Sequence, residues 1–275
     1  MSFETILYQE DGPIGWLTLN RPDDGNMFTP QMCHEIRDCI NEVRRETRTR
    51  VLVITGAGDR FFCIGGRKEG MEETLLYAGV LPTLEMYESI DRLQKPVIAS
   101  VNGYAVGGGN VLQVVCDLTI AKESAVFRQV GPMMGSFDAG YGTWYLEDLV
   151  GKKKAKEMWM LNPRLSAQEA LAIGLINRVV PDGALREETR KMALEQRVEG
   201  VRAPGTRGVM ACRLLRVEQR QDGVHDASGR TCPGRVSSSS ERPPQARATP
   251  RFQDSRAAAG RVRPARGRLR RRDAR

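Results

Sequence analysis

The sequence predicts an α/β fold in which short buried strands alternate with glycine turns and helices. Residues 50–55 and 96–101 are continuous, largely β-branched apolar runs, which is typical of parallel strands buried on both faces. Glycines end both runs, at Gly56 and at Gly103. Three consecutive glycines at residues 107–109 then precede an apolar run that fits a buried helix.

The N-terminal part of the chain is expected to form two strands, a loop and a helix. Residues 3–20 suggest the two strands, joined by a turn at residues 11–13. Residues 20–26 are rich in turn formers and are expected to form the loop. Thr29 and Pro30 open the helix, whose apolar residues have amphipathic spacing: Met32, Ile36, Ile40 and Val43.

The later elements continue this alternation. A helix at residues 166–174 is expected to have Ser166 as its cap, with Glu169 at the reciprocal position and Gly174 at its end. The other expected elements are helices at 81–93, 143–150 and 152–161, strands at 118–121, 125–127 and 176–180, and a long glycine-rich loop at 131–142.

The net charge of +8 over 275 residues is unevenly distributed. Of the 42 Lys and Arg residues, 20 lie at or after Arg197 and all of these are Arg, against 7 of the 34 Asp and Glu residues. Residues 1–196 therefore carry −5 and residues 197–275 carry +13. Bulk charge thus gives no argument for nucleic-acid binding by the first part, and such contacts are expected only nonspecifically, through the second.

We expect residues 1–196 to form the functional domain and residues 197–275 to be a separate tail rich in Arg, Pro and Ser. Helical spacing fades after residue 196 and is absent from Ser237 onward, a composition that predicts disorder. Arg without any Lys also resembles a GC-rich reading frame shifted out of register, which is the alternative interpretation of the tail.

Cysteine, histidine and hydropathy patterns predict the cellular context. Six cysteines without CxxC spacing and only two histidines argue against a metal site and favour reduced thiols in the cytoplasm. No apolar stretch reaches about 20 residues, so no membrane span is expected. The first residues show no secretory signal pattern.

Two glycine turns are the strongest candidates for a functional site. Gly65-Gly66 and residues 107–109 both follow candidate buried strands, and glycine leaves backbone N–H groups unshielded. Two such turns can present a pair of donors to an oxygen that becomes negative, or they can simply allow close packing. Asp138, in a loop with Ser136, is similarly open to two interpretations: a turn residue, or a general acid or base.

At these residues the sequence resembles the crotonase superfamily, that is, the enoyl-CoA hydratases and isomerases. The resemblance covers residues 1 to about 195 and rests on four stretches: NRPDDGNMF, VLVITGAGDRFFCIGG, KPVIASVNGYAVGGGNVLQVVCDLTIA and SAQEALAIGLINRVV. It implies a ββα spiral core and a coenzyme A thioester as substrate, with no permanently bound cofactor. It also implies a homo-oligomer, either a trimer or a dimer of trimers.

The resemblance further implies roles for individual residues. The N–H groups of Gly66 and Gly108 would form an oxyanion hole, Asp138 would transfer protons, and Ser136 would hydrogen-bond an oxygen of the substrate. The path of coenzyme A would be lined, largely through backbone, by Asn26, Met27, Ile64 and Gly65.

Departures from the family pattern narrow the expected reaction. Hydratases of the superfamily carry two glutamates that activate water, and this chain has Val111 and Gly131 at the matching positions. Neither residue can transfer a proton, which disfavours simple hydration. Arg67 also stands where ring-forming relatives carry Asp.

Residues 125–161 look most like two ring-processing groups, the 1,4-dihydroxy-2-naphthoyl-CoA synthases and the 2-ketocyclohexanecarboxyl-CoA hydrolases. We therefore expect hydrolysis of a carbon–carbon bond in a 2-oxo-alicyclic acyl-CoA, or the reverse Dieckmann-type ring closure. Asn110, in the segment GGGNVL, favours ring opening. The alternatives are an enoyl-CoA hydratase or double-bond isomerase, and a truncated, inactive acyl-CoA binder.

Overall fold

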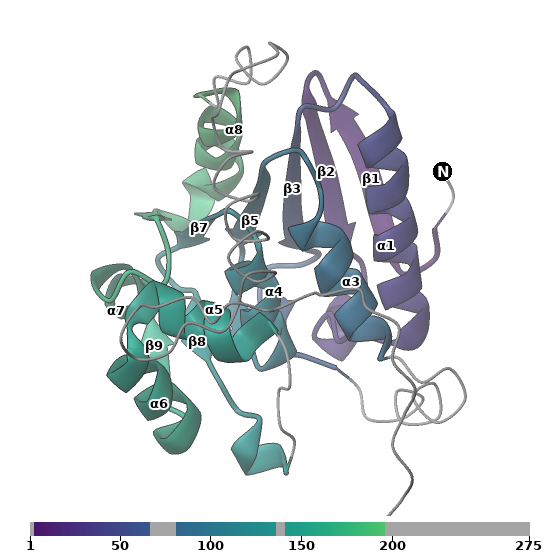
Figure 1. Ribbon diagram of the computed structural model, residues 1–275. Coiled ribbons are helices and arrows are strands. Elements are labelled where there is room, and N and C mark those ends of the chain that lie inside the picture. The colour runs from purple at the N-terminus through teal and green to yellow at the C-terminus, as the bar shows by residue number, and fades with distance from the viewer. Residues whose placement is uncertain (1–2, 67–80, 136–140, 196–275) are drawn as a thin grey trace, which may run out of the picture. The chain divides into compact units, whose positions relative to one another are not determined.

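The fold is built on a six-stranded sheet in the order β1 (Ile6–Asp11), β2 (Ile14–Leu19), β3 (Val51–Gly56), β5 (Val97–Val101), β7 (Leu118–Lys122) and β10 (Arg178–Val180) (Figure 1). The structure, a computed structural model, describes residues 3–66, 81–135 and 141–195. β1 pairs antiparallel with β2, and all the other neighbouring strands of this sheet are parallel. The predicted α/β fold with buried parallel strands is therefore confirmed.

A second, smaller sheet has the order β4 (Phe61–Cys63), β6 (Tyr104–Val106), β8 (Val126–Arg128) and β9 (Leu165–Ser166). Its first three strands are parallel, and β9 runs antiparallel to β8. Three times the chain leaves the large sheet, adds a strand to the small one and continues toward a helix. Because this step repeats, the ends of β4, β6 and β8 lie next to one another.

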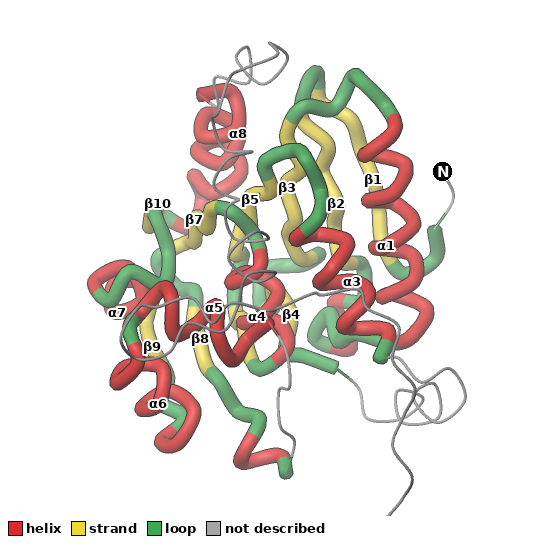
Figure 2. Tube along the Cα trace, in the orientation of Figure 1, coloured by secondary structure: helices red, strands yellow, loops and turns green. Residues whose placement is uncertain are grey.

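Helices cover both faces of the large sheet (Figures 1 and 2). One face, which includes Trp16 and Val53, packs against α8. The opposite face, which includes Leu17 and Ile54, belongs to the main core with α1, α3 and α4. The helices of the described residues are α1 (Pro30–Arg45), α3 (Pro82–Asp91), α4 (Gly108–Val115), α5 (Tyr141–Val150), α6 (Lys152–Leu161), α7 (Ala167–Ala172) and α8 (Leu185–Glu195), with 3-10 turns at Pro22–Asp24, Pro132–Met134 and Asp182–Ala184.

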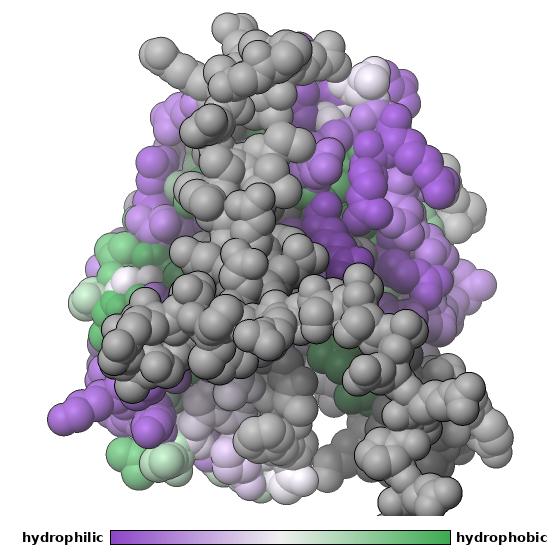
Figure 3. Space-filling model, viewed as in Figure 1, coloured by the Kyte–Doolittle hydropathy of each residue, from purple (hydrophilic) through white to green (hydrophobic). Residues whose placement is uncertain are grey.

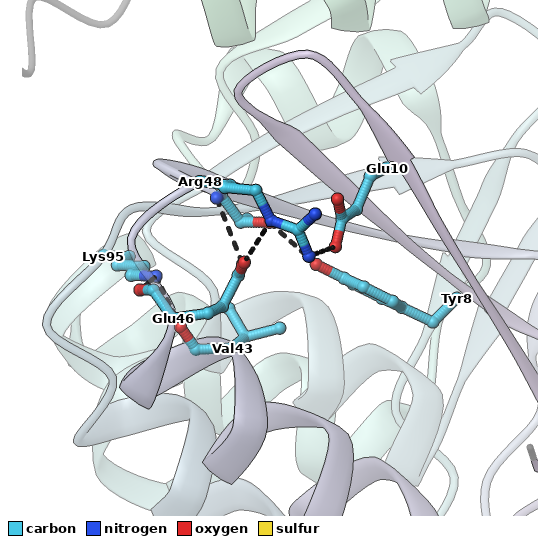
Figure 4. A network of polar contacts seen from close by, with 7 residues as sticks. Tyr8, Glu10, Val43, Glu46, Arg48 and Lys95 are labelled. Atoms are coloured by element: carbon cyan, nitrogen blue, oxygen red, sulfur yellow. Dashed lines mark hydrogen bonds and ion pairs between the residues drawn. The ribbon is translucent and has the colours of Figure 1, made fainter. Parts of the chain in front are cut away.

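α1 shows how local sequence signals define an element. The Thr29 side chain accepts a hydrogen bond from the Met32 N–H at 3.2 Å, and Pro30 occupies the first turn, as the sequence predicted. At the other end, the Lys95 ammonium group donates to the backbone carbonyls of Val43 and Glu46 (Figure 4). Since Lys95 lies just before β5, this contact ties the end of the helix to the sheet.

Other predicted elements were confirmed with small shifts at their ends, and the cap of α7 is the predicted one. The Glu169 N–H donates to the Ser166 hydroxyl at 3.2 Å, and the Ser166 N–H donates back to the Glu169 carboxylate at 2.8 Å.

β6 and α8 are two of the elements that the sequence did not predict, and β9 is another. β6 was hidden because Gly103 was taken as a strand break; a Cβ there would lie 2.2 Å from the Arg60 carbonyl oxygen, so this glycine allows two chain segments to touch. α8 was hidden because the buried Thr189 interrupts its apolar stripe; the Thr189 hydroxyl hydrogen-bonds Ser100 and Leu185 instead.

The loop expected at residues 131–142 was also too long. Within the described residues, Pro132–Met134 form a 3-10 turn, and α5 already begins at Tyr141. Gly142 is buried in the first turn of that helix. Gly142 was therefore taken for a loop residue in the sequence although it lies inside a helix.

Polar and apolar side chains are unevenly distributed over the surface. Figure 3 shows polar residues over α1 and apolar ones at the edge formed by α6 and α7. Within residues 131–135 and 141–195, the exposed large apolar side chains are Met133, Met134, Trp144, Leu149, Met160, Leu161 and Leu194. Contiguous residues of this kind often mark interaction surfaces. The homo-oligomer implied by the family resemblance stays a prediction.

All described residues belong to one unit, Met1–Gly223. The expected tail at residues 197–275 lies outside the described residues, so the boundary at 196 stays a prediction. None of the helices within residues 3–66, 81–135 and 141–195 is long and apolar enough to cross a bilayer.

Glu35 attaches the N-terminal segment to α1. Its carboxylate accepts hydrogen bonds from the backbone N–H groups of Glu4 and Thr5, at 3.1 and 2.8 Å, and from the side chains of Thr5 and Gln31. Partial burial tends to raise the pKa of Glu35, but these hydrogen bonds outweigh burial and hold the pKa below its ordinary value of 4.5.

Glu35→Gln is expected to lower the free energy of unfolding by about 1–2 kcal/mol at pH 7. Because the folded-state pKa is depressed, this contribution is full above the unfolded-state pKa and is lost as pH falls through the folded-state pKa. The difference between the two proteins should therefore shrink below about pH 4. Urea unfolding at neutral and acidic pH measures it, and an equal difference at both would contradict a role for the charge.

Candidate active site

The two glycine turns singled out in the sequence lie against each other. β4 and β6 are parallel neighbours, so the residues that follow them leave the small sheet at the same edge. A Cβ on Gly65 would lie 3.1 Å from the Gly108 nitrogen, and one on Gly108 would lie 3.3 Å from the Gly65 Cα. The two backbones are therefore in contact, with no side chain between them.

Close packing explains three of these glycines. Gly65 has a φ of +103° and Gly107 a φ of +54°, in the region that side chains disfavour. A Cβ on Gly109 would lie only 1.9 Å from the Cys63 carbonyl oxygen, because the first turn of α4 packs directly on the end of β4. The packing interpretation of the sequence is thus correct for Gly65, Gly107 and Gly109.

Packing does not explain Gly66. Its φ lies outside the left-handed region, and among the described residues nothing lies within 4 Å of a Cβ built on it. Gly66 is exposed and Gly108 is partly exposed, whereas Gly65, Gly107 and Gly109 are buried. The open space at this junction adjoins Gly66 and Gly108.

The neighbouring backbone groups are paired, whereas the two candidate donors are open. Phe28 N–H donates to the Gly65 carbonyl, and Gly107 N–H donates to the Arg128 carbonyl, both at 2.9 Å. Within residues 3–66, 81–135 and 141–195, neither Gly66 N–H nor Gly108 N–H donates a hydrogen bond. Gly108 N–H also begins α4, whose dipole favours negative charge there. This arrangement can hold an oxygen that becomes negative.

The predicted coenzyme A residues differ in exposure. Met27 and Ile64 are partly exposed, and Ile64 N–H donates to the Gly25 carbonyl at 3.2 Å. Asn26 is fully buried, and its side-chain amide donates to the carbonyls of Ala57 and Phe61 at 3.1 and 2.8 Å. Asn26 therefore braces the loop, and the coenzyme path along these residues stays a prediction.

The two positions that the family resemblance matches to the hydratase glutamates, Val111 and Gly131, carry no carboxylate. Val111 is buried in the first turn of α4, and Gly131 precedes the turn at Pro132–Met134. Beside them, the Asn110 amide donates to the Gln129 side chain at 3.0 Å, and the Gln113 amide donates to Asn110 at 3.1 Å. Neutral amides thus link the start of α4 to the segment after β8.

Ser136, Asp138 and Arg67 lie outside the described residues, so their predicted roles stay predictions. The residue that follows the Ser136 segment, Tyr141, packs against Tyr87 with ring centroids 6.2 Å apart. The Tyr87 hydroxyl in turn donates to the Gly108 carbonyl at 2.8 Å. The Tyr87 side chain therefore connects Tyr141, at the C-terminal end of that segment, to Gly108. Tyr87 was not identified from the sequence, where it was one more buried residue of a helix.

Cys63 is buried beside the glycine turn. Burial raises the pKa of its thiol to about 12, so the thiol is protonated at neutral pH and is not a nucleophile. Within the described residues, no group of three or more His, Cys, Asp or Glu side chains is arranged to hold a metal ion.

Comparison with known proteins identifies the family. The profile of the enoyl-CoA hydratase/isomerase family matches residues 9–202. The chain is 30% identical to an enoyl-CoA hydratase from Bacillus anthracis, with a TM-score of 0.68 over 79% of this chain and 84% of that one. It is 28% identical to a monofunctional enoyl-CoA isomerase from M. smegmatis, with a TM-score of 0.63 over 82% and 97% of the two chains.

A probable enoyl-CoA hydratase/isomerase from Mycobacterium abscessus is 26% identical, with a TM-score of 0.69 over 82% and 86% of the two chains. The chain therefore belongs to the enoyl-CoA hydratase/isomerase family, within the crotonase superfamily of acyl-CoA enzymes. The resemblance stated from the sequence is confirmed.

Replacement by alanine should have very different effects at Gly109 and at Gly66. Gly109→Ala should lower the free energy of unfolding by about 3 kcal/mol or more, because its Cβ meets the Cys63 carbonyl at 1.9 Å. Gly66→Ala, the matched control, should change it by less than about 0.5 kcal/mol. Chemical denaturation of both variants measures the difference, and equal stability would contradict the direct contact between α4 and β4.

Proposed function

We propose that this acyl-CoA enzyme breaks, or in reverse forms, the carbon–carbon bond between the α-carbon and the ketone carbon of a cyclic β-oxo acyl thioester. One observation carries the proposal: Gly66 and Gly108, whose N–H groups donate no hydrogen bond within the described residues, lie at one junction. The family resemblance adds that Val111 and Gly131 stand at the positions of the water-activating glutamates. The site thus retains the means to stabilise an enolate and lacks the carboxylates of a hydratase.

In the ring-opening direction, water adds to the ring ketone and the resulting alkoxide collapses to a carboxylate. The bond to the α-carbon breaks, and its electron pair passes into the thioester as an enolate. The N–H groups of Gly66 and Gly108 would hold the enolate oxygen, and each such donor contributes on the order of 3–4 kcal/mol to the transition state. Protonation of the α-carbon then gives an open-chain acyl-CoA that bears a carboxylate.

Asp138 would act as the proton carrier in this scheme. It would take a proton from the attacking water and return one to the α-carbon, while the Ser136 hydroxyl would bind the ketone oxygen. Both residues lie in the segment whose flanking residue, Tyr141, packs against Tyr87. The packing of Tyr141 on Tyr87 supports the assignment of the adjoining residues 136–140 to the acyl pocket.

The rival function is the hydration or double-bond isomerisation named for the similar structures. Isomerisation also passes through a thioester enolate and needs only a single base, so the glycine turns alone do not separate the two reactions. The substrate decides between them, since only the ring reaction needs a ketone β to the thioester.

A side-by-side assay tests the proposal. The full chain incubated with 2-oxocyclohexanecarbonyl-CoA should give an acyclic product that is heavier by one water, whereas crotonyl-CoA should be turned over at least about 100-fold more slowly. Mass spectrometry of both reactions measures this. Hydration of crotonyl-CoA at a comparable kcat/KM, without ring opening, would replace the proposal by its rival.

A second experiment tests the proton carrier. Asp138→Asn should lower kcat at least about 100-fold, because an amide cannot accept the proton. Its affinity for the acyl-CoA, measured by calorimetry, should stay within about twofold. Asp148→Asn, which changes an exposed Asp on α5, is the matched control and should keep full activity. Unchanged turnover by Asp138→Asn would remove Asp138 from the mechanism.

A further inference from the structure

We propose that Tyr87 is a positioning residue, which holds the two candidate donors, Gly66 and Gly108, in the relative placement that a thioester enolate requires. The proposal rests on the function proposed above. It adds that the two turns, which have no side chains of their own, depend on one tyrosine from α3 for their alignment.

The first contact of Tyr87 is with Gly108. Its hydroxyl donates to the Gly108 carbonyl at 2.8 Å, and a Cβ built on Gly108 would lie 3.2 Å from that hydroxyl oxygen. Tyr87 is only 4% exposed, and the hydrogen bond is partly buried. The bond fixes the carbonyl of a residue whose own N–H donates no hydrogen bond within the described residues, and it thereby restrains the first peptide groups of α4.

The second contact leads to Gly66. The Tyr87 ring packs edge-on against the Phe28 ring, with centroids 6.3 Å apart and planes at 79°. Phe28 is fully buried, its N–H donates to the Gly65 carbonyl, and it forms a parallel bridge with Gly66. Tyr87 therefore braces, through one aromatic side chain, the backbone that carries the second donor.

The third contact is with the flank of the proposed acyl pocket. Tyr87 and Tyr141 pack at 6.2 Å with an interplanar angle of 64°, and Tyr141 directly follows residues 136–140. One side chain thus touches Gly108, the support of Gly66 and the residue next to the Asp138 segment. No such set of contacts is needed for a tyrosine that merely fills the core.

This role predicts a specific energetic signature. A donor that shifts by a few tenths of an ångström loses more interaction with a full negative charge than with a neutral carbonyl, so the enolate suffers more than the bound substrate. Loss of the Tyr87 hydroxyl should therefore lower kcat with little effect on KM.

The experiment uses acetoacetyl-CoA, a β-oxo thioester whose enolate absorbs in the near ultraviolet. Bound to the full chain, its enolisation pKa should fall below that of the free thioester. In Tyr87→Phe this pKa should rise by about one unit, kcat on the ring substrate should fall about 5- to 10-fold, and KM should stay within about twofold. Replacement of Tyr87 by 4-aminophenylalanine, which keeps a hydrogen-bond donor on the ring, should bring the enolisation pKa and kcat most of the way back to their wild-type values.

Tyr145→Phe is the matched control. Tyr145 is 3% exposed, its ring centroid lies 5.6 Å from that of Tyr141, and its hydroxyl donates to Asp91. It should lower the melting temperature and leave the enolisation pKa of the bound probe unchanged.

Each result decides a separate point. The role of Tyr87 would be overturned if the enolisation pKa of the bound probe in Tyr87→Phe equals that in the wild-type chain. It would also be overturned if Tyr87→Phe and Tyr145→Phe change this pKa equally. Either result would leave the oxyanion site intact. If the wild-type chain binds the probe without lowering its enolisation pKa, the oxyanion site itself fails, and the inference about Tyr87 fails with it. If Tyr87→Phe does not fold, an unrestored pKa in the 4-aminophenylalanine variant overturns the inference.

Discussion

The parallel pairing of β4 with β6 is the constraint on which the site depends. It brings two chain turns so close that the Gly108 nitrogen would lie 3.1 Å from a Cβ on Gly65. At this separation a side chain on Gly65 would meet the Gly108 backbone, so backbone groups face each other at this contact. Such groups are neutral and cannot titrate, and they are held by the sheet itself. The donors are therefore available at every pH at which the protein is folded.

Contacts around the junction fix the relative positions of the two glycine turns. The first turn of α4 rests on the Cys63 carbonyl at Gly109, and Gly107 is anchored to the carbonyl at the end of β8. The buried amides of Asn110 and Gln129 join the same two elements from inside. Each of these contacts also stabilises the fold. A substitution that displaces the candidate donors is therefore expected to lower the stability of the protein as well.

Sequence patterns revealed the architecture better than the contacts within it. The runs at residues 50–55 and 96–101, and the Ser166–Glu169 cap, are local signals, and the structure confirms them. β6 is three residues long, which is too short for a periodic pattern. The hydrogen bond from Tyr87 to Gly108 joins residues 21 positions apart in different helices, and no local pattern records it. Gly65 and Gly66 look alike in sequence, yet only the structure separates the packed glycine from the open one.

The burial of Cys63 protects this cysteine from acylation by a thioester substrate. Thioesters transfer their acyl group to thiolates, and a reactive cysteine beside the site would become acylated during turnover. Cys63 lies two residues from Gly65, but burial raises its pKa to about 12, and the other three cysteines of the described residues are buried as well. The cysteines of the described residues are thus shielded from exchange with a thioester, which protects both these side chains and the acyl group.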